Sequence, residues 1–124
     1  MIPKFRARDQ RGNWHVGLLT FMFGQYAIVN EADENTVYLI DKETIGQSTG
    51  LKDKNGVEIF EGDVLYYIPF ESHINNSIIV FEKGSFCTKM LRNGKLTSVR
   101  FIDSEEYEVI GNIHENPELL EVAE

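Results

Sequence analysis

Short turn signals divide this chain into many brief segments, and they restrict its fold more than any other feature does. Polar, glycine-bearing or acidic runs recur along the sequence: DQRGN at 9–13, EADEN at 31–35, DKNG at 53–56, EKGS at 82–85 and RNGK at 92–95. The segments between them are apolar or alternate between apolar and polar residues, as strands do. This rhythm is typical of an all-β protein, so the sequence predicts a mainly β fold.

The first part of the chain reads as an antiparallel β meander. Four strand-like segments follow one another and end near Asp41, and residues 42–47, KETIGQ, lack alternation and predict one helical turn. Gly17 lies inside a strand-like segment, where glycine marks a bulge or a close approach of two backbones. We expect an N-terminal meander lobe over residues 1–46 and a second lobe over residues 47–124, together forming one unit.

The second lobe is expected to be a small SH3-like or pseudo-barrel of antiparallel strands. Gly62 and Asp63 precede an apolar strand, and we expect glycine there to adopt a positive φ while the aspartate bonds neighbouring backbone N–H groups. Three strands follow in hairpin succession, and the last strand is interrupted by Gly111. The final segment, ENPELLEVAE, predicts a short helix with Asn116 as its cap and Pro117 at its first position.

The charge of the chain is uneven and argues against nucleic acid as the first choice of partner. The net charge is −8. Residues 1–11 carry several cations against Asp9 alone, whereas residues 103–124 are acidic and contain no Lys or Arg. A phosphate backbone repels such an acidic surface, while an acidic face keeps a protein in solution or docks a basic partner.

Cysteine usage and hydropathy bear on the compartment. Cys87 is the only cysteine, so no intrachain disulfide can form, which fits a reducing cytoplasm. The opening MIPKFRARDQ has no apolar stretch of the signal-peptide kind, and the longest apolar runs are far shorter than the roughly 20 residues of a membrane helix. We expect a cytoplasmic protein without a membrane segment.

Several local patterns suggest chemistry, and each has a plainer explanation. GQSTG at 46–50 matches a nucleophile elbow around Ser48, but a turn and another strand follow where a helix is required. DKNG begins like a calcium loop, yet Glu58 and Val64 stand where glycine and glutamate are needed. The remaining candidates are scattered, with no zinc-type spacing: His15, His73, His114 and Cys87. We therefore predict no catalytic residue, no metal and no cofactor, and hence no enzyme.

The central stretch from Ser48 to Val64 allows two interpretations. Its Asn-Gly turn and Gly-Asp pair can be a tightly specified piece of fold, with Gly56 at positive φ. Loops on a rigid β scaffold also carry binding, and an aromatic beside a loop can stack a base when cations lie near. The candidate partner-binding residues are Lys52, Asp53, Lys54, Asn55, Tyr66 and Tyr67. Phe70, Arg6 and Arg8 would add to a nucleic-acid surface.

Four segments carry a resemblance to a known family. IPKFRARD at the start, ETIGQSTGLKDKNGVEIFEGDVL in the centre, and IIVFEKGSF and EEYEVIGNIHENPELL later resemble the YopX family, from Ile2 to about Leu120. The resemblance implies a phage or prophage protein, present in the bacterial host cell, with a fold similar to small β-barrels. It brings no established biochemical activity, so no catalytic or ligand position carries over.

Two functional hypotheses follow. The first is a phage or prophage accessory protein that binds an unidentified protein partner of host or phage origin. The alternative is a small β-barrel that binds nucleic acid through its basic first strand and Tyr66 or Tyr67. Residues 14–29 are apolar on both expected strand faces, which one small sheet cannot cover, so we also expect a homo-oligomer.

Overall fold

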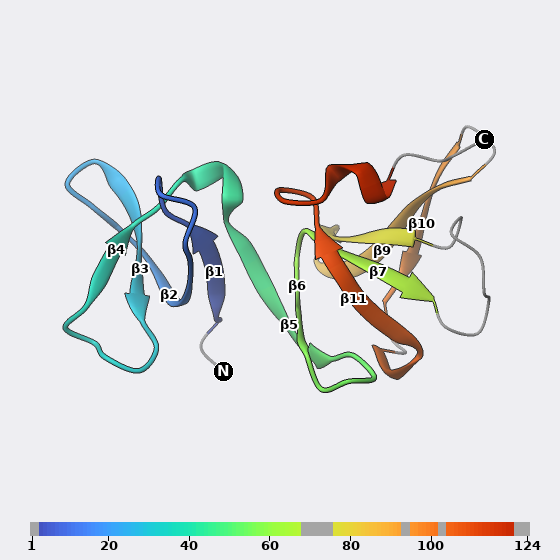
Figure 1. Ribbon diagram of the computed structural model, residues 1–124, viewed down its shortest axis with the longest axis horizontal. Helices are drawn as coiled ribbons and strands as arrows, with labels where there is room; N and C mark the ends of the chain where they lie inside the picture. The colour runs from blue at the N-terminus through green and yellow to red at the C-terminus, as the bar shows by residue number, and fades with distance from the viewer. Residues whose placement is uncertain (1–2, 68–75, 93–94, 102–103, 121–124) are drawn as a thin grey trace. The chain divides into compact units, whose positions relative to one another are not determined.

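Strands dominate the computed structural model, which describes residues 3–67, 76–92, 95–101 and 104–120 (Figure 1). The chain forms two compact units, residues 1–48 and residues 49–124. Within the described residues both sheets are antiparallel, and the helices are short 3-10 turns. The predicted mainly β fold is confirmed.

The N-terminal unit is the expected meander. Its strands are β1 (Phe5–Arg8), β2 (Trp14–Met22), β3 (Gln25–Asn30) and β4 (Val37–Leu39), followed by the 3-10 turn η1 (Lys42–Thr44) and the first residues of β5 (Gly46–Lys52). In space the order is β4-β3-β2-β1-β5, so each of the first four strands lies beside its neighbour in sequence. β4 therefore forms one edge of this sheet. The helical turn predicted within residues 42–47 is η1.

One face of this sheet carries the core of the unit. The register places Leu19 opposite Ile28 and Ile28 opposite Tyr38, so the three side chains share a face. Ala7, Ile28 and Ile40 are buried there, and Leu19, Tyr38 and other half-buried apolar residues pack around them. Alternation along β2 and β3 thus produces the core, because every second residue points to the same side.

The opposite face is also apolar, as residues 14–29 predicted. Leu18 pairs with Val29, and Val29 pairs with Val37, so these side chains form a row across β2, β3 and β4 on the face away from the core. Leu18, Val37 and Leu39 are exposed, and Leu39 retains 47% of its accessible surface. That a partner subunit covers this surface stays a prediction.

The C-terminal unit contains a five-stranded antiparallel sheet in the order β10-β9-β8-β7-β11. Its elements are β6 (Glu58–Phe60), β7 (Asp63–Tyr67), β8 (Asn76–Glu82), β9 (Ser85–Arg92), β10 (Lys95–Arg100), η3 (Ser104–Glu106), β11 (Tyr107–Asn112) and η4 (Pro117–Leu120); the last residues of β5 lie beside β6. Ile59, Leu65, Ile79 and Phe101 form its core. The predicted succession of hairpins is present as β8-β9-β10.

Two predicted backbone features of this unit are confirmed. Gly62 has a φ of 93°, and the buried Asp63 accepts a hydrogen bond of 2.8 Å at Oδ2 from the Phe60 N–H. The pairing of β11 with β7 shifts register between Val109 and Gly111, which is the interruption expected at that glycine. The turn at Asn93-Gly94 lies outside the described residues.

The predicted C-terminal helix is only a 3-10 turn, η4, within the residues described. Asn116 does not cap it as expected: its Oδ1 accepts a hydrogen bond of 3.3 Å from the N–H of Asn112. The Asn116 N–H also donates to the carbonyl of Asn112, at 2.8 Å. The side chain therefore closes the turn that follows β11, and this use competes with capping because it occupies the same oxygen.

Candidate functional site

Asp53, in the predicted central loop, is part of the fold. Its side chain is buried, since the residue is only 5% exposed. Oδ1 accepts hydrogen bonds from the N–H groups of Asn55 and Val57, at 2.8 and 2.9 Å, and Oδ2 accepts one from the N–H of Val109 at 2.9 Å. Burial raises the pKa of Asp53, but these three donors outweigh it and leave the pKa below its usual 3.8. One ionised carboxylate thus shapes the turn and fixes it to β11.

The other loop candidates lie on the surface beside β11. Lys52, Lys54 and Asn55 are exposed. The Asn55 side-chain amide donates to Glu108 Oε2 at 3.1 Å, and Glu108 lies opposite Tyr66 in the sheet. Asn55, Glu108 and Tyr66 therefore follow one another across this surface.

Tyr67 lies opposite Tyr107 in the same pair of strands, and the two rings are 5.2 Å apart. Tyr66 and Tyr67 are both half-buried, so neither ring lies fully open to a stacked base. A partner-binding role for the loop and the tyrosines stays a prediction.

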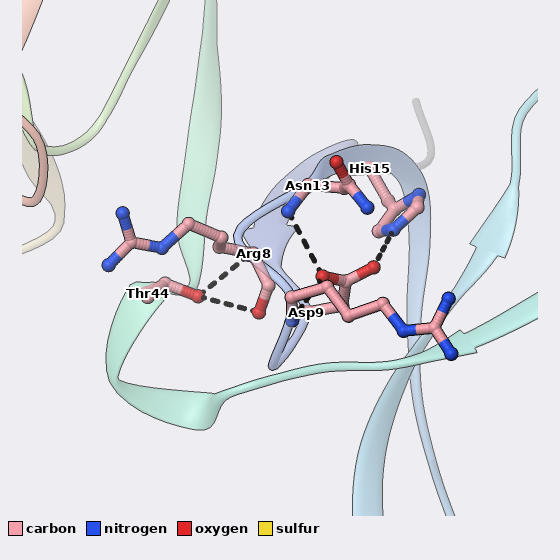
Figure 2. Close-up of polar contacts among 6 residues, drawn as sticks. Arg8, Asp9, Asn13, His15 and Thr44 are labelled. Carbon is pink, nitrogen blue, oxygen red and sulfur yellow. Dashed lines mark hydrogen bonds and ion pairs between the residues drawn. The ribbon is translucent and has the colours of Figure 1, made fainter.

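The N-terminal unit holds an arrangement that we did not predict from the sequence. Figure 2 shows the turn after β1, where the Asp9 side chain points toward Asn13 and His15. Oδ1 of Asp9 accepts hydrogen bonds from the N–H groups of Arg11 and Asn13, at 2.8 and 3.0 Å, and Oδ2 lies 2.8 Å from Nε2 of His15. The bond to His15 and the backbone bond from Asn13 lower the pKa of Asp9 to about 2. The carboxylate is therefore ionised over the whole physiological range.

The imidazole of His15 is also held from the side of β4. Its ring stacks on Tyr38 with 3.7 Å between ring centroids and an interplanar angle of 13°. The turn itself is tied to η1, because the Arg8 N–H donates to Thr44 Oγ1 at 2.7 Å (Figure 2). Hydrogen bonds and stacking together fix the orientation of the imidazole.

Two open depressions lie on this part of the N-terminal unit, and Asp9 and His15 line the larger one. The larger has a volume of about 650 Å³ and is lined by Asp9, Arg11, His15, Tyr38 and their neighbours. The second, of about 490 Å³, lies against Phe21, Tyr26 and Ile40. Both are lined by Gln10 and Gln25, so they adjoin.

The lining of the larger depression is rich in polar and ionisable groups. It offers carboxylate, guanidinium, imidazole and amide groups, but the described residues that line it include no Ser, Thr or Cys that His15 could activate. Nor does the described part of the chain bring three metal-ligating side chains together. The arrangement can orient hydrogen-bonding groups of a ligand.

A signal for this site was present in the sequence. DQRGN forms a turn in which the Asp9 carboxylate accepts hydrogen bonds from the N–H groups two and four residues later. The turn joins β1 and β2 into an antiparallel hairpin. Ala7 pairs with His15, so the two ends of the turn face each other and bring Asp9 to the histidine. Taking His15 only as an isolated histidine missed this pair.

The remaining sequence candidates are not brought together. Ser48 lies inside β5, where its N–H donates to the carbonyl of Lys4 at 2.8 Å, and not on a strand-to-helix turn. Cys87 is a half-buried residue of β9 whose Sγ lies 3.9 Å from the carbonyl oxygen of Ser85. The N–H of His114 donates to Asn112 Oδ1 in the turn after β11. Phe70 and His73 lie outside the described residues.

These features define a small, mainly β protein of two antiparallel units, with open polar depressions on its N-terminal unit. The chain belongs to the YopX family, whose model, described as "YopX protein", matches residues 4–121. It is similar to the crystal structure of protein EF1440 from Enterococcus faecalis, with 33% identity over 98% of this chain and 99% of that chain and a TM-score of 0.49. No curated protein matches it. Among the described residues, no helix is long and apolar enough to cross a bilayer.

Proposed function

We propose that this chain is a phage or prophage accessory protein that acts by binding another protein, with an extended segment of that partner lying along β4. The phage setting comes with the resemblance to the YopX family. The observation that supports the binding mode is the position of β4, which is the edge strand of the N-terminal sheet and supplies Val37, Tyr38 and Leu39 to the larger depression. Extended peptides bind many proteins by adding a strand to such an edge.

The backbone of β4 is arranged to accept a further strand. Asn30 donates to the carbonyl of Thr36, and Ile40 donates to the carbonyl of Tyr26. Hydrogen-bonded pairs alternate with non-bonded pairs in an antiparallel ladder, so the intervening Val37 and Leu39 direct their N–H and C=O groups away from β3. These outward groups are the donors and acceptors that an added strand requires.

The side chains beside this edge supply contacts of both kinds. Val37 and Leu39 are exposed and offer apolar surface. Asp9, Arg11 and His15 line the adjoining depression with ionisable groups. A partner segment that alternates apolar and polar residues fits this edge, because its successive side chains point to opposite faces.

Leu39→Pro should abolish partner capture while the protein stays folded. Proline has no N–H and its ring blocks a neighbouring strand, but the N–H of residue 39 does not bond β3, so the existing sheet tolerates the change. We expect immobilised wild-type protein to retain a specific protein from a bacterial lysate and Leu39→Pro to lose it. Circular dichroism of the variant should match that of the wild type.

Leu39→Thr is the matched control for this experiment. It removes the same apolar side chain but keeps the N–H and suits a strand. Capture that survives in Leu39→Thr and disappears in Leu39→Pro identifies strand addition. Equal capture by all three proteins contradicts the proposal.

A nucleic-acid partner is the second candidate, and one observation favours it. The guanidinium carbons of Arg6 and Arg8 lie 5.0 and 5.7 Å from the ring centroid of Trp14, on the face of the sheet away from the core. Cations interleaved with an aromatic ring resemble the surfaces that bind single strands. The net charge of −8 opposes this partner.

A gel-shift series with single-stranded DNA separates the two candidates. If the protein binds protein partners only, no complex should form even at low salt. A complex that weakens steeply with salt, and weakens again in Arg8→Gln, would favour the nucleic-acid candidate, because each phosphate contact releases counterions. Lys83→Gln is the control for the loss of one positive charge. Lys83 is an exposed cation in the β8–β9 hairpin.

A further inference from the structure

The tip of the β2–β3 hairpin carries a phenylalanine in an unfavourable backbone conformation. Phe23 and Gly24 connect the strands, with φ of 53° and 75°. Two-residue turns of this kind need positive φ at both positions and therefore favour Asn-Gly or Asp-Gly. A bulky residue at positive φ is rare because its Cβ crowds the backbone. Such an outlier supports a hypothesis of function when the fold itself does not require the residue.

A second hairpin of the same chain shows what the turn itself requires. Lys83 and Gly84 connect β8 and β9 with φ of 51° and 83°, nearly the same geometry. There the exposed position holds a solvated cation. At the equivalent position Phe23 is 92% exposed, so its ring gains little from the rest of the fold. The turn therefore does not explain the choice of phenylalanine.

The aromatic surface continues from the tip along the hairpin. Phe21 is 62% exposed and meets Tyr26 edge to face, with 5.1 Å between the ring centroids. We call these exposed aromatic residues, Phe21, Phe23 and Tyr26, the hairpin patch. Exposed apolar surface of this kind marks an interaction site.

Charge distinguishes the hairpin patch from the rest of the protein. The strands β2, β3 and β4 contain no Asp, Glu, Lys or Arg, although the chain as a whole has a net charge of −8. Two copies of a chain with this net charge repel each other overall. They can approach at an uncharged surface, where burial of apolar area outweighs the remaining repulsion.

We propose that the hairpin patch binds a second copy of this chain, with Phe23 as the anchor of a two-fold contact. In a two-fold contact the same patch meets itself, so an uncharged aromatic surface is its own complement. Exposed aromatic rings of this type dominate the energetics of interfaces. The inference is independent of strand addition at β4, because it rests on the turn residues and on β2 and β3.

Analytical ultracentrifugation of wild type and Phe23→Asn at micromolar concentrations tests this assignment. We expect the wild type to form a dimer and Phe23→Asn to dissociate with a Kd at least about tenfold higher, as for loss of an interface anchor. Denaturation at a dilution where both are monomers should show Phe23→Asn to be as stable as the wild type or more stable, since asparagine tolerates positive φ. Lys83→Asn relieves the same backbone strain and should leave the dimer unchanged.

Four outcomes would overturn the proposal. Three of them concern the assembly state: a wild type that stays monomeric throughout, a Phe23→Asn dimer as tight as the wild-type dimer, or a Lys83→Asn dimer that dissociates as readily as Phe23→Asn. The fourth concerns lipid: a monomeric wild type that co-sediments with phosphatidylcholine vesicles, and a Phe23→Asn variant that does not, would assign the patch to a membrane surface.

Discussion

Gly17→Ala is expected to cost more than about 3 kcal/mol of unfolding free energy, a loss typical of severe overpacking against a rigid neighbour. A Cβ added at Gly17 would overlap the carbonyl oxygen of Val29 and lie 3.0 Å from the carbonyl carbon and 3.1 Å from the nitrogen of Glu31. All three atoms belong to the backbone, so no side chain can rotate away. The strands β2 and β3 would have to separate where they carry the core of the N-terminal unit.

Gly24→Ala, at the tip of the same hairpin, is the matched control. No atom lies within 4 Å of a Cβ placed there, and the φ of 75° leaves only backbone strain. We expect a loss of about 1 kcal/mol, as for alanine at a positive φ. Chemical denaturation of both variants gives the comparison. Equal losses would mean that β3 moves away from Gly17 freely.

Local chemistry explains why much of the fold was predictable. Gly17 was recognisable as a site of close approach because glycine inside an apolar strand gains nothing from packing. Gly62 and Asp63 were recognisable as a corner because a positive φ and a backbone-bonding carboxylate use short-range contacts alone. Turn chemistry and alternation operate within a few residues, and so they can be read from a single sequence.

The candidate site depends on the local turn at Asp9 and also on contacts that no local pattern contains. The depression beside Asp9 and His15 exists because β4 returns to place Tyr38 against the imidazole, more than twenty residues later in the chain. Asn116 was predicted to cap a helix because it precedes Pro117, but its Oδ1 accepts a hydrogen bond from the Asn112 N–H instead. Only the folded backbone decides between two partners for one oxygen.

Asp53 in the central loop shows the same limit of local sequence patterns. An aspartate two residues before an asparagine occurs twice, at Asp33 and at Asp53. Each carboxylate accepts a hydrogen bond from the N–H of the residue two positions later, Asn35 or Asn55. Asp33 is exposed, whereas Asp53 is buried and also binds β11. The motif predicted the turn in both cases, but burial is a property of the whole fold.

Asp53→Ala is therefore expected to cost about 3 kcal/mol or more, because it removes a buried carboxylate that accepts three N–H hydrogen bonds and ties the loop to β11. Asp33→Ala is the matched control, with an exposed carboxylate whose partners can bond water instead. We expect it to cost no more than about 1 kcal/mol. Chemical denaturation at neutral pH measures both. An Asp53→Ala variant as stable as Asp33→Ala would show that the carboxylate does not hold the loop.

Acid should reduce the difference between wild type and Asp53→Ala. The pKa of Asp53 in the folded protein lies below its usual 3.8, because three N–H donors favour the ionised form over the effect of burial. A group with a lowered folded pKa contributes stability that is fully present above pH 3.8 and is lost as the pH falls through the folded pKa. Denaturation of both proteins between neutral pH and about pH 2 should show the wild type losing more stability than the variant. A difference that stays constant over this range would mean that the ionised carboxylate is not what stabilises the turn, and the loop would again be a candidate for partner binding.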